Sequence, residues 1–425
     1  MEKNLSYWLD KYSEAILLLA TLVVNICNYG LNVILARWLG PEGFSEANIL
    51  AVIVMIFSFL GLGVQMIAAK LEAEDEHSWL ALLKNRVWIF AIAIMMILLL
   101  GSQGIKNYLQ FDSSYSLMIV FAGLPFYMGL CVQRGIIQGK QQFGRLAMTY
   151  VVEMIVRVGA TIGLIFLVAD HYSEIIGLGF LLSFLVVVLL FRVDIPDTES
   201  KQLGKIQLLS FVWMTILYEL SQVLINNGDI ILVKHYFEAN EAGLYASLAT
   251  LGKAIFFLTW SVVMVLFPKV ITLEKEGKPH AVYFWRAMML VAGLCGSAIV
   301  TMYLFGDWII QVAFGAEYLS VSSYLYLYTI ATSIFACANV FVYYYLSLEK
   351  YIPVIIALVF GIMQITAIIL FHESMAQVIW IQIGVLSAML MGMIIYKMTT
   401  SGSSISSDDH IEEALPNFEL QHLSS

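Results

Sequence analysis

Charged residues are scarce in this chain. They make up 12% of its 425 residues, about half of their share in an ordinary soluble domain, whereas apolar residues make up 60%. Before residue 399, no polar stretch is long enough to fold as a soluble domain. This composition excludes a soluble globular protein and predicts an all-α integral membrane protein, because each membrane helix needs about 20 apolar residues.

Residue types that commonly bind metals or act in catalysis are also few, and their spacing matches no known metal-binding or catalytic motif. The four cysteines, Cys27, Cys131, Cys295 and Cys337, lie in apolar segments without CxxC spacing. The seven histidines lie in loops, helix ends or the C-terminal tail, far apart in sequence, and no DxD or paired-carboxylate motif accompanies them. We therefore expect no metal, no cofactor and no enzyme activity, and a membrane-embedded glycan polymerase or transferase is the weakest alternative.

Long apolar runs recur along the whole chain. Windows of about 19 residues predict twelve membrane helices, which we place at 14–37, 45–70, 80–102, 114–137, 144–169, 173–193, 208–235, 242–268, 284–312, 320–347, 352–371 and 376–398.

The positive charges indicate how these helices are oriented. Of the 22 Lys and Arg residues, Arg37, Lys106 and Lys234 fall on one side of the predicted membrane. Arg157 and Lys253 fall within helices, and all the others fall on the opposite side. Because cytoplasmic loops carry the excess of Lys and Arg, we expect both termini in the cytoplasm.

A weak internal repeat relates the two halves of the chain. Residues 34–50, ILARWLGPEGFSEANIL, and 232–248, LVKHYFEANEAGLYASL, share a layout of helix end, short acidic turn and new helix. Six helices separate them, so the halves run in the same direction and form a parallel pseudo-twofold repeat of two six-helix lobes. The predicted domains are an N-terminal lobe at 1–193, a cytoplasmic linker at 194–207, a C-terminal lobe at 208–398 and a disordered cytoplasmic tail at 399–425.

Four stretches resemble a known family. They are LNVILARWLGPEGFSEANILAVI at 31–53, QRGIIQGKQQFGRLAM at 133–148, VEMIVRVGATIGLIF at 152–166 and the segment from GDIILVKHYF to VLFPKV at 228–270. This layout is similar to the polysaccharide transporter family, which includes O-antigen flippases and belongs to the multidrug, oligosaccharidyl-lipid and polysaccharide exporter superfamily. Ser45 stands where that family usually has a glycine.

The resemblance implies a function. It implies a flippase that moves an undecaprenyl-pyrophosphate-linked oligosaccharide across the bacterial cytoplasmic (inner) membrane by alternating access, for surface polysaccharide biosynthesis. The expected partners are the lipid-linked oligosaccharide, membrane lipid, H⁺ or Na⁺ and the polysaccharide polymerase machinery, with no nucleic acid.

Two cations within predicted helices are candidate substrate contacts. Arg157 lies about 13 residues, or roughly 20 Å, into the fifth helix, and Glu153 lies four residues earlier on the same face. Lys253 lies near the middle of the eighth helix. Charges at this depth usually face a protein interior or a water-filled cavity, so Arg157 is either half of a structural ion pair with Glu153 or an anion contact in a central cavity, as Lys253 can be.

The seventh helix is the most polar. Glu219, Gln222, Asn226 and Asp229 follow one face, and Glu219 or Asp229 is a candidate for coupling transport to a proton or Na⁺, although such side chains also bond helices together.

Two other polar features are open to more than one interpretation. Asn25, Asn28 and Asn32 form a stripe on the first helix that we interpret as a contact between helices. Arg134 either guides anionic headgroups at the cavity entrance or anchors the fourth helix at the membrane surface.

The main alternative function is a cation-coupled multidrug exporter with the same fold. The cavity of such an exporter should be acidic, whereas the predicted cations favour an anionic substrate.

Overall fold

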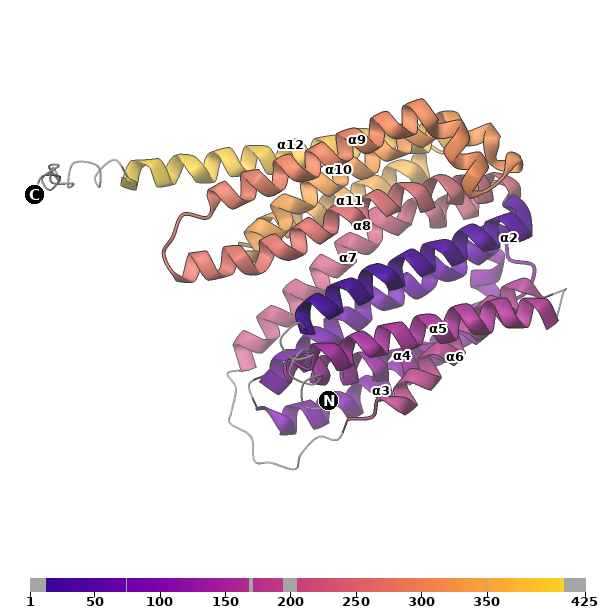
Figure 1. Ribbon diagram of the computed structural model, residues 1–425, viewed down its shortest axis with the longest axis horizontal. Helices are drawn as coiled ribbons and strands as arrows, with labels where there is room; N and C mark the ends of the chain where they lie inside the picture. The colour runs from indigo at the N-terminus through magenta and orange to yellow at the C-terminus, as the bar shows by residue number, and fades with distance from the viewer. Residues whose placement is uncertain (1–12, 74, 168–170, 194–204, 349, 409–425) are drawn as a thin grey trace, which may run out of the picture.

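The computed structural model describes residues 13–73, 75–167, 171–193, 205–348 and 350–408 (Figure 1). Within these ranges the chain is helical and contains no strand. The first half forms α2 (Ser13–Ala73), α3 (His77–Tyr108), α4 (Tyr115–Gly139), α5 (Phe143–Leu167) and α6 (Tyr172–Leu190). The second half forms α7 (Lys205–Tyr236), α8 (Ala239–Lys275), α9 (Ala281–Ala313), the 3-10 helix η1 (Ala316–Val321), α10 (Ser322–Ser347), α11 (Ile352–Leu370) and α12 (Met375–Asp408).

Helix α2 is two membrane-length segments joined at Gly40. Gly40 has φ 66° and ψ 179°, a left-handed conformation that glycine adopts without steric cost. Pro41 follows, and its fixed φ suits the first turn of the second segment. The chain reverses there within a few residues, so the two segments lie in one bundle. With these segments counted separately, the described residues form the twelve predicted helices.

The helices form two bundles, α2 to α6 and α7 to α12 (Figure 1). In each bundle one helix is central: the most apolar window is 72% buried in both the α4 and the α10 spans. The windows of α3 and α9 are 11% buried, and these helices lie on the outside. Because the fourth and tenth helices correspond in a parallel repeat, as the third and ninth do, this matching burial agrees with the predicted pseudo-twofold arrangement.

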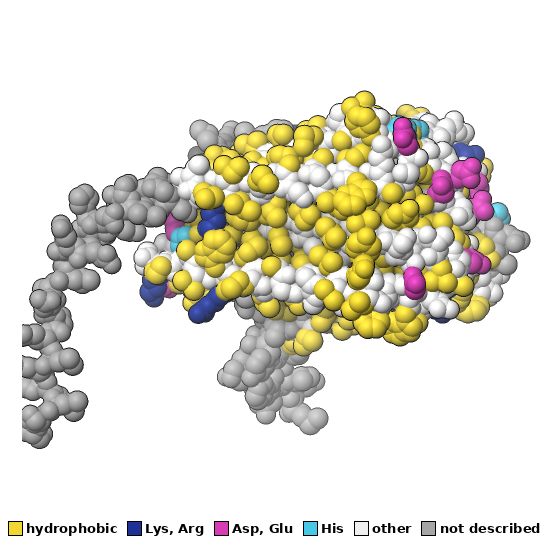
Figure 2. Space-filling view, turned by 90° about the horizontal axis from the view of Figure 1, so that it is seen from above, with side chains coloured by type: hydrophobic (Ala, Val, Ile, Leu, Met, Phe, Trp, Pro, Cys, Tyr) yellow, Lys and Arg dark blue, Asp and Glu magenta, His cyan; other side chains and the backbone are white. Residues whose placement is uncertain are grey.

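The outer surface is that of a membrane protein. Ten helices are, over their described residues, long and apolar enough to cross a membrane. Large apolar side chains such as Leu100, Tyr303 and Trp308 are exposed on α3 and α9. Figure 2 shows hydrophobic side chains over the middle of one face, Lys and Arg at one end and mainly Asp and Glu at the other.

Close approach of α2 and α4 positions the polar residues of the N-terminal bundle. A Cβ on Gly135 would contact the Gln65 carbonyl oxygen, and one on Gly139 would lie 2.6 Å from the Ala69 oxygen. Only glycine fits at these two positions, one turn apart on α4. The neighbouring Arg134 lies within the bundle and is 3% exposed.

Two helices of the C-terminal bundle continue well beyond their predicted ends, and one of them is α8, which ends at Lys275 instead of 268. Helix α12 continues to Asp408 instead of ending at 398. The sequence TTSGSSISSD after Met398 contains no proline and one glycine, so nothing in it ends the helix at the membrane edge. The rest of the predicted tail, 409–425, and most of the predicted linker, 194–204, lie outside the described residues.

Candidate functional site

A cavity of about 430 Å³ lies mainly within the N-terminal bundle, where α8 of the other bundle packs against it. Its wall comes from both segments of α2, from α4, α5 and α6, and from α8 of the other bundle. Among the described residues its charged side chains are Arg134, Glu153, Arg157 and Lys253. The cavity therefore carries three cations and one carboxylate, and all four residues were site candidates from the sequence.

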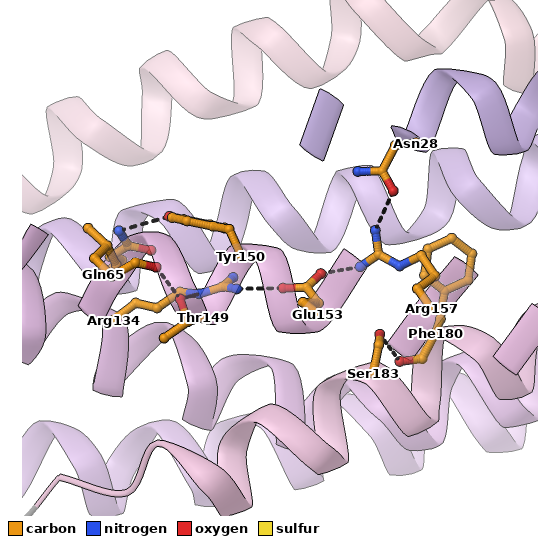
Figure 3. Close-up of polar contacts among 10 residues, drawn as sticks. Asn28, Gln65, Arg134, Thr149, Tyr150, Glu153, Arg157, Phe180 and Ser183 are labelled. Atoms are coloured by element: carbon orange, nitrogen blue, oxygen red, sulfur yellow. Dashed lines mark hydrogen bonds and ion pairs between the residues drawn. The ribbon is translucent and has the colours of Figure 1, made fainter. Parts of the chain in front are cut away.

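Glu153 is shared by two arginines (Figure 3). Its Oε2 accepts a hydrogen bond of 2.6 Å from Arg134 Nη2, and its Oε1 accepts one from Arg157 Nη2. Arg157 follows Glu153 by four residues on α5, whereas Arg134 comes from α4. One carboxylate cannot neutralise two guanidinium groups, so this arginine–glutamate triad keeps a net positive charge next to the cavity.

Arg157 takes part in the ion pair with Glu153 and also lies at the cavity, whereas its contact with an anion stays a prediction. Its Nη1 donates to Asn28 Oδ1 at 3.3 Å, and its guanidinium carbon lies 4.7 Å from the centre of the Phe180 ring. The buried Nε has no hydrogen-bond partner among the described residues. Arg157 thus has donor capacity that the protein leaves unused.

Arg134 is not a surface anchor, so that interpretation was wrong. Only 3% of it is exposed, and its Nε donates to Thr149 Oγ1 at 3.0 Å. Its guanidinium carbon lies 4.0 Å from the centre of the Tyr150 ring. Arg134 lines the cavity, and its side chain crosses from α4 to α5 within the bundle; that it guides headgroups at the entrance stays a prediction.

Two glutamine amides, one of them on the second segment of α2, lie beside the triad. Gln65 Nε2 donates to Gln138 Oε1 at 2.7 Å and to Tyr150 OH at 3.4 Å (Figure 3). Gln65 lines the cavity and is 6% exposed. The sequence analysis did not select Gln65, since a single glutamine in an apolar run gives no sign of which neighbour it faces.

Lys253 brings a cation from the C-terminal bundle to the same cavity. It is 7% exposed, and its Nζ donates to Asn227 Oδ1 at 2.9 Å. No carboxylate pairs with this ammonium group within ion-pair distance among the described residues. The ammonium group thus has an amide as its hydrogen-bond acceptor, and the charge of Asp229 acts on it from beyond ion-pair distance.

The two carboxylates of α7 do not line the cavity. Asp229 is 1% exposed, and its Oδ2 accepts hydrogen bonds of 2.8 Å from both Tyr245 OH and Tyr328 OH and one of 3.3 Å from Gln382 Nε2. Its Oδ1 is buried without a hydrogen-bond partner among the described residues. Glu219 is 5% exposed and lies two turns or more from this group. The site candidates on α7 thus lie outside the cavity wall, although the charge of Asp229 interacts with Lys253 in that wall.

The amide stripes of α2 and α7 have different surroundings. On α7, Gln222 Nε2 donates to Asn339 Oδ1 at 3.1 Å, and Asn226 Nδ2 donates to the backbone carbonyl oxygen of Gln222 at 3.1 Å. These amides join protein groups to each other. On α2, Asn25, Asn28 and Asn32 line the cavity, and of the three only Asn28 makes the expected contact between helices among the described residues, by accepting a hydrogen bond from Arg157 of α5.

Comparison of sequences identifies the family. The family described as polysaccharide biosynthesis protein matches residues 34–323, well over half of the chain. The chain belongs to this polysaccharide biosynthesis protein family. A comparison with curated protein sequences gives no match.

Comparison with solved structures shows which fold this chain has. The chain is similar to the lipid II flippase MurJ in an inward closed conformation, with a TM-score of 0.74 and 15% identity over 91% of this chain and 87% of that one. It is also similar to an inward-facing multidrug resistance MATE family transporter of the MOP superfamily, with a TM-score of 0.68 and 13% identity over 88% and 92%. A MOP superfamily transporter from Pyrococcus furiosus matches with a TM-score of 0.53 and 14% identity over 91% and 93%. The polysaccharide biosynthesis protein therefore has a transporter fold.

In this family member the two bundles are joined at the Gly40 end. Arg37 Nε donates to the Ala313 carbonyl oxygen at 2.9 Å, and its Nη2 donates to the Val312 oxygen. Tyr318 OH donates to the Ala36 oxygen at 2.9 Å. Arg37 thus caps the C-terminal end of α9, where a cation is favoured by the free carbonyl groups and the helix dipole.

More contacts between the bundles occur at the same end. Lys234 is 1% exposed, and its Nζ donates to Ser45 Oγ at 2.8 Å. Gln110 Nε2 donates to the His235 carbonyl oxygen at 2.8 Å. Ser45, the departure from the usual glycine, supplies the hydroxyl that accepts from this buried lysine. These contacts close the cavity at the Gly40 end, and in Figure 1 the bundles diverge toward the other end.

Arg37→Gln should weaken this closure. A neutral side chain loses charge-assisted hydrogen bonds to α9, and because Arg37 is exposed we expect about a threefold to tenfold shift toward the state open at the Gly40 end. The measurement is the labelling rate of a cysteine placed at Asn32, in a background free of native cysteines, by a membrane-impermeant thiol reagent added outside cells. Lys106→Gln removes a charge at the same end and is the control. Equal labelling rates in all backgrounds would contradict the assigned closure.

Proposed function

We propose that this protein is a flippase for an oligosaccharide linked through pyrophosphate to an undecaprenyl lipid. The observation that carries the proposal is the charge of the cavity: Arg134, Arg157 and Lys253 line it, and Glu153 is the one carboxylate among its described residues. The cations come from both bundles. An anionic group bound between them can contact both halves of the protein at once.

The chemistry of these cations fits a pyrophosphate. A buried cation without a paired anion is costly in a membrane protein. A pyrophosphate would lower this cost only while the cargo is bound, and an arginine can hold two phosphate oxygens at once in a bidentate arrangement. Arg157 has a buried Nε without a partner, and Lys253 has only an amide acceptor. Both have donors available for such a ligand.

The charge of the cavity favours this function over a cation-coupled multidrug exporter of the same fold. An exporter of cationic drugs needs carboxylates at its binding site. Here Asp229 and Glu219 lie outside the cavity lining, and Glu153 is already bound to two arginines. A positively charged drug would be repelled from this site.

We place the protein in the bacterial cytoplasmic membrane with both termini in the cytoplasm. The first segment of α2 begins, and α12 ends, at the end opposite Gly40 (Figure 1). Lys and Arg gather at that end and carboxylates at the other (Figure 2). The rule that cytoplasmic surfaces are enriched in Lys and Arg supports this orientation.

Glycan display in a strain that lacks the gene tests the function. We expect the deletion to abolish surface glycan and to accumulate lipid-linked oligosaccharide inside the membrane, and the wild-type gene to reverse both effects. Purified protein in vesicles should move the lipid-linked oligosaccharide between leaflets. Restored drug resistance without any effect on the glycan would instead identify a drug exporter, and glycan transfer by purified protein would identify an enzyme.

Asp229 is the candidate for coupling this transport to H⁺ or Na⁺. Three donors bind its Oδ2, whereas Oδ1 has no partner among the described residues and can take a proton or a cation. Asp229→Asn keeps an oxygen for the three donors but removes the charge, so we expect a folded protein whose export is at least about tenfold slower. Transport into vesicles under a proton gradient and under a Na⁺ gradient measures the effect. Glu219→Gln is the matched control, and wild-type transport by Asp229→Asn would exclude this role.

A further inference from the structure

We propose that the asparagines of α2 form the surface that binds the sugar part of the cargo. Asn25, Asn28 and Asn32 follow one face of the first segment of α2, and all three line the cavity together with Asn48 from the second segment. We call these four residues the amide ladder. This inference rests on the proposed function, because it assigns a second part of the same substrate to a second part of the same cavity.

The ladder is open to a ligand. The side chain of Asn25 is exposed, and those of Asn28 and Asn32 are partly exposed. Asn28 accepts a hydrogen bond from Arg157, but no hydrogen bond joins Asn25 or Asn32 to another residue within the described ranges. Amides in contact with lipid would be costly. Their position at the cavity leaves water or a polar ligand as their hydrogen-bond partner.

The amides of α7 differ from those of α2 in their hydrogen bonding, which indicates that amides in this protein do not all lack protein partners. Asn226, Asn227 and Gln222 are the same kinds of side chain on the corresponding helix of the other bundle. Each is bonded to a protein group: Gln222 to Asn339, Asn226 to Gln222, and Asn227 to Lys253. Each of these α7 amides has at least one bond within the protein, although Asn227 Nδ2 has none among the described residues, whereas Asn25 and Asn32 face the cavity without any such bond in the described ranges.

Asn48 adds an independent observation. It is 7% exposed, lines the cavity, and its Oδ1 is buried with no hydrogen-bond partner in the described part of the chain. A buried acceptor without a donor is costly. Asn32 and Asn48 are equally distant from Gly40 along the chain on either side of the bend, so they lie at about the same depth. A hydroxyl group between them can donate to the Asn48 oxygen.

The chemistry of an amide fits sugar hydroxyl and acetamido groups. Asparagine offers both two N–H donors and a carbonyl acceptor, so it can pair with groups that donate and accept at once. Successive ladder residues are separated by about 4.5 Å and 6 Å along the helix axis, comparable with the length of one pyranose ring. Asn28 also bonds to Arg157, which places the ladder directly beside the proposed pyrophosphate contact.

Comparing the affinities for two lipids distinguishes the contribution of the amide ladder from that of the anion site. The ligands are undecaprenyl pyrophosphate, either bare or carrying an N-acetylhexosamine disaccharide, and the measurement is the dissociation constant with purified full-length protein in lipid nanodiscs. For the wild type we expect the disaccharide to tighten binding. The double variant Asn25→Ala with Asn32→Ala should bind the bare lipid within about twofold of the wild type, which also shows that it is folded. It should bind the glycosylated lipid about tenfold more weakly than the wild type.

A matched amide on α7 provides the control. Asn226→Ala removes the same group from a residue outside the cavity lining and should leave both dissociation constants unchanged. The proposed role of the amide ladder is refuted if the double variant binds the glycosylated lipid as tightly as the wild type does, or if its affinity for both lipids falls by the same factor. It is also refuted if the disaccharide does not increase the affinity of the wild type. The last result leaves the flippase proposal intact, whereas a wild type that binds neither lipid removes both proposals.

Discussion

Arg157→Gln is expected to give a folded protein that exports about a hundredfold less glycan. The variant removes the cavity arginine with unused donors but leaves Arg134 and Glu153 as a neutral, hydrogen-bonded pair. The loss should be large because two charge-assisted hydrogen bonds to a phosphate group, each about 1.5–3 kcal/mol, disappear from a site shielded from water. Surface glycan in a strain lacking the gene, normalised to the amount of protein in the membrane, measures the effect.

Lysine at the same position provides the control for charge. Arg157→Lys keeps the cation but cannot make bidentate contacts, so it should recover part of the export. Arg134→Gln also leaves a neutral pair, between Glu153 and Arg157, and tests whether both arginines are required. Full export by a folded Arg157→Gln variant would mean that Arg157 is a structural residue only.

Glu153→Gln should have the largest effect on stability. It leaves Arg134 and Arg157 buried on either side of a neutral amide, with no carboxylate to compensate either charge. Removal of one partner from a buried ion pair typically destabilises a protein by about 3–5 kcal/mol, because the remaining charge stays in a low-dielectric environment. We expect less folded protein in the membrane and a lower unfolding temperature of the purified protein in detergent.

A second substitution should reverse much of this loss. Glu153→Gln combined with Arg134→Gln leaves one cation, Arg157, and so restores the net charge of the wild-type triad. The double variant should unfold at a higher temperature than Glu153→Gln alone. If Glu153→Gln is as stable as the wild type, the carboxylate does not hold the two arginines together as described.

Hydropathy predicted the helices themselves, but it could not predict which neighbouring helix each side chain contacts. Twelve apolar runs gave the twelve segments, and the i,i+4 relation of Glu153 and Arg157 followed from helix geometry alone. Arg134 was misplaced because depth along a helix does not tell which neighbour a side chain meets. The glycines at 135 and 139 were a signal that this part of α4 lies inside the bundle, since they allow α4 to approach α2 closely.

The two polar stripes illustrate the same limit. Spacing correctly put Asn25, Asn28 and Asn32 on one face of α2 and Gln222 and Asn226 on one face of α7. It could not tell which face was turned to the cavity, because that depends on how the two bundles lie against each other. Nor could it find the contact of Asp229 with Tyr245, Tyr328 and Gln382, which come from three other helices.

The first segment of α2 connects the cavity to the contacts of Arg37 that join the bundles at the Gly40 end. One rigid segment carries Asn32, which faces the cavity, and Arg37, which holds α9, about 7.5 Å apart along the axis. A displacement of this segment by a ligand in the cavity would therefore move Arg37 directly, because no loop separates Asn32 from Arg37. Thermodynamic linkage makes the effect reciprocal: if occupancy of the cavity loosens the hold of Arg37, then loosening that hold must raise the affinity for cargo by the same factor.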